Sequence, residues 1–207
     1  MFLLNVLAQA QCVREGIYFG LGVGDSIDHS HSKVEDRISL LANEGSQSKN
    51  HALGAVFFGY GYTVCNYMYY AFELGSYFPQ RSITISDSGI LSTNRLTQQD
   101  YITSDVLVGF RLTNYFLFYM RGGSSYAAVK FYHKETDAGN LLDLHAKRTG
   151  LAGRIGAGIN YLITQHIGVG LDFIYTAYPK LNRDVSFLNL EGSSRANYIG
   201  LSTICSF

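Results

Sequence analysis

The sequence predicts an all-β protein: an eight-stranded antiparallel up-and-down transmembrane β-barrel with short periplasmic turns and four long extracellular loops. Glycine and tyrosine are abundant, with 22 and 16 residues, whereas the 207 residues include only 2 prolines. Segments of about ten residues alternate between bulky apolar residues and small or charged ones. Charged residues make up 15% of the chain, against about 25% in soluble proteins. No apolar run approaches the roughly 18 residues of a transmembrane helix, so a membrane would have to be crossed by strands.

The two ends of the chain are expected to differ from the strands between them. Residues 1–7 are mostly apolar and Ala8-Gln9-Ala10 fits the small-x-small pattern of a cleavage site. We therefore expect 1–10 to be the remnant of an export signal and 11–207 to be a single barrel domain; a frayed apolar N-terminus is the alternative. The formal net charge is zero, which gives no indication of a nucleic-acid partner.

Eight strands and two kinds of connection follow from the pattern. We place the strands at 16–25, 52–62, 67–78, 100–112, 116–126, 150–162, 167–178 and 196–207. Three short turns lie near 63–66, 113–115 and 163–166, and four long polar segments lie near 26–51, 79–99, 127–149 and 179–195. Thr63, Thr113 and Thr164, one in each turn, are 50 and 51 residues apart, which indicates a repeated hairpin. Short turns on one rim and long segments on the other are typical of outer-membrane barrels.

The two faces of the predicted strands differ in a way that identifies the solvent. In 167–178, Ile167, Val169, Leu171 and Phe173 share one face, while the other carries Gly168, Gly170 and Asp172. A soluble lipocalin-like barrel would place the apolar face inside and would expose Lys, Glu and Ser rather than glycine. Glycine and isolated charges suit a narrow interior, so we expect the apolar face to contact lipid.

The charged residues within the strands are then expected to point inward and to pair. A lipid-facing arginine at the midplane would cost about 2–4 kcal/mol, and an unpaired buried charge costs several kcal/mol. We predict an internal network of six groups, formed by Glu73, Asp105, Arg111, Arg121, Arg154 and Asp172. Eight strands leave an interior just wide enough for side chains, which argues against a wide pore.

Three runs and the last strand carry a resemblance to a known family. The runs are Gly20-Leu21-Gly22-Val23-Gly24, Gly156-Ala157-Gly158-Ile159-Asn160-Tyr161 and Gly168-Val169-Gly170-Leu171-Asp172-Phe173. Strand 196–207 ends at Phe207 with Leu201 and Ile199 on the same face, which resembles the C-terminal signal that the outer-membrane assembly machinery recognises. With these features the chain resembles the small OmpA-type, opacity-protein and OmpX-like barrels, without the peptidoglycan-binding domain that OmpA adds.

The resemblance implies a bacterial outer-membrane location and surface roles such as membrane integrity, adhesion or antigen exposure. It also implies contact with outer-membrane lipids and lipopolysaccharide, a monomer, and loops that meet host or environmental ligands. We therefore expect a non-enzymatic surface protein without cofactors. The alternatives are a narrow porin-like channel for ions or small solutes and a lipid-modifying enzyme, for which no motif joins a Ser to His51 or His166.

A pair of histidines, a basic segment and three cysteines are further features that bear on ligands and disulfides. Asp28-His29-Ser30-His31 has two metal-ligating side chains, but on a polar segment these are more often solvated, so we predict no metal site. Lys130, Lys134, Lys147 and Arg148 make the third long segment basic, which suits either a solvated hairpin or binding of lipopolysaccharide phosphates. Cys12, Cys65 and Cys205 map to one rim of an exported chain, so a disulfide is expected between Cys12 and either Cys65 or Cys205.

Overall fold

The computed structural model describes residues 14–36, 42–65, 67–87, 92–137, 140–185 and 188–207. The predicted signal remnant 1–10 and Cys12 lie outside these ranges. The described residues form ten strands: β1 Gly16–Asp36, β2 Ala42–Val64, β3 Met68–Phe78, β4 Arg81–Asp87, β5 Ser92–Arg111, β6 Phe116–Asp137, β7 Asn140–Leu162, β8 Ile167–Ala177, β9 Leu181–Val185 and β10 Leu188–Ser206. None of the described residues belongs to a helix that is long and apolar enough to cross a membrane.

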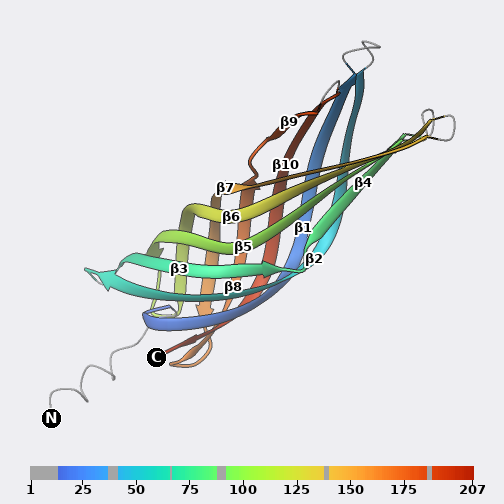
Figure 1. Ribbon diagram of the computed structural model, residues 1–207. Coiled ribbons are helices and arrows are strands. Elements are labelled where there is room, and N and C mark those ends of the chain that lie inside the picture. Colours follow the sequence, from blue (N-terminus) through green and yellow to red (C-terminus); the bar gives the residue numbers. More distant parts are fainter. Residues whose placement is uncertain (1–13, 37–41, 66, 88–91, 138–139, 186–187) are drawn as a thin grey trace.

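The strands close into one antiparallel barrel with eight positions around its circumference (Figure 1). Closure comes from the pairing of β1 with both β2 and β10, in which Gly20 lies opposite Ile204 and Phe57. β4 continues beyond β3 along β5, and β9 continues beyond β8 along β10. Each break contains a proline, Pro79 or Pro179, which has no N–H to donate to a ladder. The predicted eight-stranded up-and-down barrel is confirmed.

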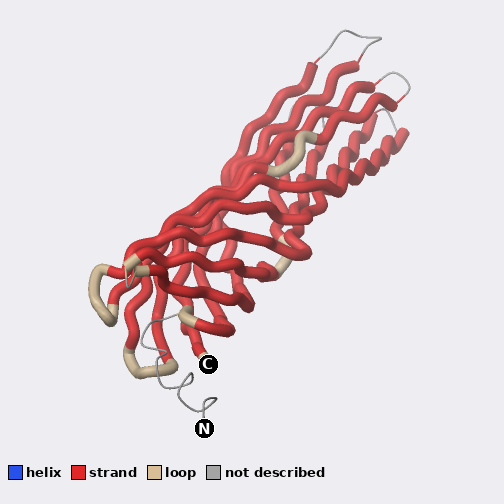
Figure 2. The backbone as a smooth tube through the Cα atoms, turned by 90° about the vertical axis from the view of Figure 1, so that its left-hand side faces the viewer, coloured by secondary structure: helices blue, strands red, loops and turns tan. Residues whose placement is uncertain are grey.

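At the end of the barrel opposite the short turns, the strands continue further than the sequence pattern predicts. β1, β2, β5, β6, β7 and β10 contain 19 to 23 residues, whereas about 9–11 suffice to cross a bilayer. The four polar segments that we predicted as long loops are therefore mostly strand. In Figure 2 they continue the barrel wall as hairpins, while the short turns gather at the opposite end with the C-terminus.

In the half of the barrel next to the short turns, the outer face of the strands is apolar, as expected for contact with lipid. Phe110 and Phe173 are 52% and 51% exposed on the outer surface, whereas Arg121 and Asp172 are 3% and 5% exposed. β8 alternates along its length between buried residues and residues that are exposed or, at Tyr175, half-buried. The exposed apolar residues of this half, such as Phe110 and Phe173, thus form an apolar belt around an interior that holds the ionic side chains.

This polarity reverses beyond the belt. The hairpin extensions enclose a second, apolar core in which Leu96, Phe131 and Leu181 are almost completely buried. On the outer surface of the same extensions, Lys134 and Lys147 are exposed. This is the ordinary arrangement of a protein in water, where burial of apolar surface stabilises the fold. The hairpins are thus a packed structure in water that stands on a membrane-embedded barrel.

Candidate functional site

The lumen of the membrane-embedded half contains a buried cluster of ionic groups on β3, β5, β6, β7 and β8. Arg121 on β6 lies at its centre, with Nη2 at 3.0 Å from Glu73 Oε1 and 3.2 Å from Asp172 Oδ1. Its Nη1 lies 3.3 Å from Asp105 Oδ2. All four side chains are at most 7% exposed, so their attraction is screened little by water.

Arg154 extends the cluster toward the hairpins. Its Nε lies 3.3 Å from Asp105 Oδ1, and its guanidinium lies over the Tyr77 ring at 4.7 Å from the centroid. Desolvation of a buried guanidinium is costly unless a carboxylate and further donors or rings compensate. Asp105 and Tyr77 supply these contacts to Arg154. Five of the six residues predicted for the network are therefore adjacent in the structure.

Arg111, the sixth predicted member, lies elsewhere. It lies beyond the belt, at the rim of the barrel that carries the short turns, where its Nη1 is 4.0 Å from Glu15 Oε2. Its backbone N–H donates to Tyr67 O at the same rim. Arg111 has the inward parity of β5 but is the last residue of that strand, so its side chain reaches the rim and not the middle of the lumen. Its inclusion in the central cluster was wrong.

Arg14 takes the place that we had assigned to Arg111. Its Nη1 lies 2.6 Å from Glu73 Oε2, and its guanidinium stacks over the rings of Phe57 and Tyr119. Its side chain is fully buried although it precedes β1. Sequence reasoning missed it because residues before the first strand show no alternation. One signal was present: counted back from Tyr18, position 14 has the inward parity of β1.

The complete lower cluster is therefore electrically balanced. Among the described residues it joins three arginines to three carboxylates: Arg14, Arg121 and Arg154 with Glu73, Asp105 and Asp172. Phenols of Tyr18 and Tyr119 donate to Glu73 and Asp172 at 3.2 and 2.5 Å. Each phenol adds a second partner to an oxygen that an arginine already contacts, Glu73 Oε2 or Asp172 Oδ1, and buried ion pairs require such additional hydrogen bonds.

Glycine on one strand makes room for these tyrosine rings on the next. A Cβ at Gly59 would overlap the Tyr18 phenol, and one at Gly61 would overlap Tyr69. A Cβ at Gly158 would likewise overlap the phenol of Tyr119, which lies directly opposite Gly158 in the β6–β7 ladder. Inside the barrel, glycine and tyrosine therefore occur together: each of these three rings occupies the volume that a neighbouring side chain would fill.

A second, smaller cluster lies where the belt ends and the hairpins begin. Arg81 on β4 donates from Nη1 to Asp28 Oδ1 at 3.1 Å and from Nη2 to Asp100 and Tyr178. Burial raises the pKa of Tyr178 above its usual range; Arg81 opposes this effect and Asp100 adds to it. The phenol therefore keeps its proton and donates to Asp100 Oδ2 at 2.8 Å.

His51 completes this upper cluster. Its Nδ1 lies 2.8 Å from Asp28 Oδ2 and its Nε2 lies 3.1 Å from the carbonyl oxygen of Ser82. Both ring nitrogens therefore contact acceptor oxygens. The sequence had singled out His51 only as one half of a hypothetical Ser–His pair, and the structure places it in a hydrogen-bonded position between β1, β2 and β4.

Between the two clusters the lumen is packed. The cavity beside Arg121 and Asp172 has a volume of about 10 Å³ and is bounded by Phe57, Tyr77 and Tyr198. Such a volume holds at most one water molecule. The described side chains therefore fill the middle of the barrel as eight strands predict.

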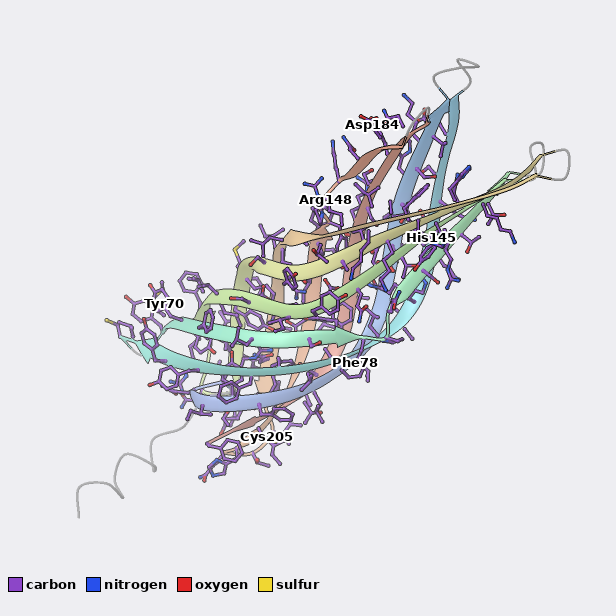
Figure 3. All side chains as sticks on the ribbon, in the orientation of Figure 1. Tyr70, Phe78, His145, Arg148, Asp184 and Cys205 are labelled. Atoms are coloured by element: carbon purple, nitrogen blue, oxygen red, sulfur yellow. The ribbon has the colours of Figure 1, made fainter. Side chains whose placement is uncertain are left out.

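The remaining predicted residues lie on the outer surface or at the rims. Ile199, Leu201 and Phe207 are exposed on β10 or just after it, and the Phe207 N–H donates to Ile17 O at 2.9 Å. Cys65 and Cys205 are free thiols in the structure, and Cys205 lies at the turn end in Figure 3. The assembly signal and the pairing of Cys12 stay predictions.

The histidines of the first polar segment do not form a metal site together. His29 contacts Ser48 Oγ through Nδ1 at 2.6 Å, and His31 Nε2 lies 3.5 Å from Glu44 Oε1. Within the described ranges no three His, Cys, Asp or Glu side chains are grouped so that they could hold a metal ion.

A closed barrel with a lipid-facing belt and an ionic interior defines the class of integral outer-membrane β-barrel proteins. The chain belongs to the outer membrane protein β-barrel domain family, whose model matches residues 1–194. No curated protein matches the sequence.

Solved structures of three outer-membrane proteins are similar to this chain. Outer membrane protease OmpT of Escherichia coli is 8% identical, with a TM-score of 0.55, and the match covers 94% of this chain and 97% of OmpT. OprG of Pseudomonas aeruginosa is 13% identical, with a TM-score of 0.52 and coverages of 95% and 99%. Neisserial surface protein A is 13% identical, with a TM-score of 0.48 and coverages of 93% and 100%. At these identities the likeness concerns the fold alone.

Proposed function

We propose that this protein is a non-enzymatic outer-membrane surface protein whose folded hairpins act outside the cell. The observation that carries the proposal is the second core. Leu96, Phe131 and Leu181 pack inside the extensions of strands that are roughly twice as long as a membrane crossing needs. Ordering so many polar residues costs conformational entropy. A rigid platform beyond the membrane is of use to a protein that is recognised by, or adheres to, something outside it.

The packed lumen supports this role over that of a channel. Arg121 and its three carboxylate partners lie across the middle of the barrel, and the adjoining void has a volume of about 10 Å³. Purified protein in planar bilayers is expected to show no resolvable conductance. The same measurement on Arg121→Ala and Glu73→Ala tests whether the cluster is a gate, because steady single-channel steps in wild type or in either variant would favour the channel.

The hydrogen bonding of His51 speaks against the enzyme alternative. A histidine base needs one nitrogen free for the substrate, but both nitrogens of His51 contact acceptors, Asp28 and the Ser82 carbonyl. Lipid A from cells with and without the protein is expected to give identical mass spectra. A modification that depends on the protein and disappears in His51→Gln would identify a lipid-modifying enzyme instead.

The surface role is tested by shortening a hairpin. Replacing residues 129–148 with a two-residue turn removes the β6–β7 extension and leaves both strands of the belt. The shortened protein is expected to keep heat-modifiable migration on a gel, which reports the folded barrel, and to lose binding to host cells or resistance of the envelope to detergent. Unchanged binding and unchanged resistance would contradict the proposal. Thiol labelling of Lys147→Cys in whole cells, in a background in which Cys12, Cys65 and Cys205 are replaced by serine, checks that this hairpin faces outward.

A further inference from the structure

β8 gives way to β9 beside β10 at the base of the hairpins (Figure 1). A groove on the outer surface lies at this place. Its volume is about 270 Å³, close to the lower end of small-molecule sites at roughly 300 Å³. The ladder with β10 runs from Arg195 opposite Ala177 to Gly192 opposite Leu181, and Pro179 lies in the gap between these pairs. The break in the strand therefore opens a recess just above the lipid-facing belt.

The chemistry of this groove is cationic and rich in hydroxyl groups. Lys180 and Arg195 are exposed on its wall, and within the described ranges neither is in an ion pair with a carboxylate. His29 and His31 line the β1 side, together with the hydroxyls of Ser46 and Ser193. One described carboxylate lies at its edge, that of Glu44, which is 3.5 Å from His31. Two fixed positive charges beside several hydroxyls suit a ligand that carries phosphate and sugar groups.

A second groove lies closer to the short-turn end of the barrel, on β1, β8 and β10. It has a volume of about 570 Å³ on the lipid-facing surface and is walled by Leu21, Val23, Val169 and Leu201, with Gly22 at its floor. Leu201 lies opposite Val23 in the β1–β10 ladder, and Thr203 lies opposite Val169 in the β8–β10 ladder. The small residues between larger apolar ones leave this groove open to the acyl chains of the bilayer.

The two grooves lie along the same strands, β1, β8 and β10. Arg195 and Leu201 are six residues apart on β10, which corresponds to about 20 Å along a strand. With a tilt of about 35–45° this is roughly 15 Å of depth, or half of a hydrocarbon core of about 30 Å, and roughly 13 Å sideways around the barrel. The lower groove is therefore at the depth of the acyl chains of the leaflet that a headgroup in the upper groove would occupy, and a lipid with several acyl chains is broad enough to span the sideways shift. The hairpins mark that leaflet as the outer one.

We propose that these two grooves together bind a phosphorylated sugar that carries several acyl chains, with the chemistry of lipid A. Lys180 and Arg195 contact a phosphate, Ser46 and Ser193 contact sugar hydroxyls, and one acyl chain lies along Leu21, Val23 and Leu201. An anionic phospholipid would use the same charges, but it offers fewer hydroxyl groups to the serines. The proposal depends on the outer-membrane location and not on the surface role proposed above.

Native mass spectrometry of the full chain in detergent micelles tests the site with purified bisphosphorylated lipid A as the probe. The double variant Lys180→Gln/Arg195→Gln is expected to bind it about tenfold more weakly than wild type, the loss that two surface charge contacts produce. The matched control, Lys134→Gln/Lys147→Gln, removes two exposed charges from the β6–β7 hairpin and is expected to change binding less than about twofold.

Three results would overturn the proposal. Equal losses in the two double variants would assign binding to overall charge or to the β6–β7 hairpin. Equal binding of phosphatidylglycerol would assign the groove to anionic phospholipids. Unchanged binding in Thr203→Phe, which fills the lower groove, would show that no acyl chain lies there. Heat-modifiable migration of each variant verifies that the barrel is folded before binding is compared.

Discussion

The phenol of Tyr119 lies over Gly158 of the neighbouring strand, so close that a Cβ at position 158 would overlap its oxygen. The same phenol donates to Asp172 Oδ1 at 2.5 Å. Gly158 therefore determines where the ring sits, and the ring determines one hydrogen bond of the ionic cluster. Backbone, ring and charge are coupled across β6, β7 and β8.

Gly158→Val is expected to destabilise the barrel by about 1–3 kcal/mol, the usual cost of overpacking. The added methyl groups would displace Tyr119 and remove its hydrogen bond to Asp172. The measurement is the urea concentration at which heat-modifiable migration is lost in detergent. The control is Gly153→Val, because no described atom lies within 4 Å of the Cβ that this residue would add. Equal losses in the two variants would mean that the Tyr119–Gly158 contact carries no special weight.

The pair of Arg154 and Asp105 is suited to a double-mutant cycle. Arg154→Met and Asp105→Asn are each expected to cost about 3–5 kcal/mol, because each leaves the buried cluster with one uncompensated charge. The double variant is expected to cost less than the sum of the two, since the remaining cluster is balanced again: Arg14 and Arg121 face Glu73 and Asp172. Additive costs would show that the pair is not coupled.

Arg14 is expected to matter more than Arg111. Arg14→Met removes a fully buried guanidinium that lies 2.6 Å from Glu73, and the expected cost is again about 3–5 kcal/mol. Arg111→Met removes a guanidinium whose ion pair with Glu15 at the rim has a distance of 4.0 Å, and it is expected to cost less than Arg14→Met. Unfolding of both variants in urea compares them directly. The reverse order would restore Arg111 to the cluster and place Arg14 outside it.

The apolar core of the hairpins predicts an effect confined to them. Phe131→Ala is expected to cost about 3–5 kcal/mol, the usual range for a buried phenylalanine. Because Phe131 lies beyond the belt, proteases should cut the hairpins of this variant while the barrel remains heat-modifiable. Phe118→Ala is the control, since Phe118 is 43% exposed on the lipid-facing surface. Hairpins equally resistant in both variants would argue against a separate core.

Local patterns in the sequence are enough to predict the barrel, its strand count and the inward direction of the charges on β3, β5, β6, β7 and β8. These follow from local rules: side chains alternate along a strand, and proline and turn residues mark where strands end. The same rules misjudged the polar segments as loops. Alternation there has the opposite sense, with Leu96, Phe131 and Leu181 inside, because water and not lipid surrounds the hairpins.

The contacts between charged residues could not be predicted from these local patterns. Arg14 and Arg111 both have inward parity, but distance along the barrel axis places Arg14 beside Glu73 and Arg111 at the rim. The upper cluster of Arg81, Asp28 and Asp100 likewise joins β4, β1 and β5 across the lumen. Parity along one strand gives a direction, whereas contact across a barrel depends on the register of every strand between the two residues.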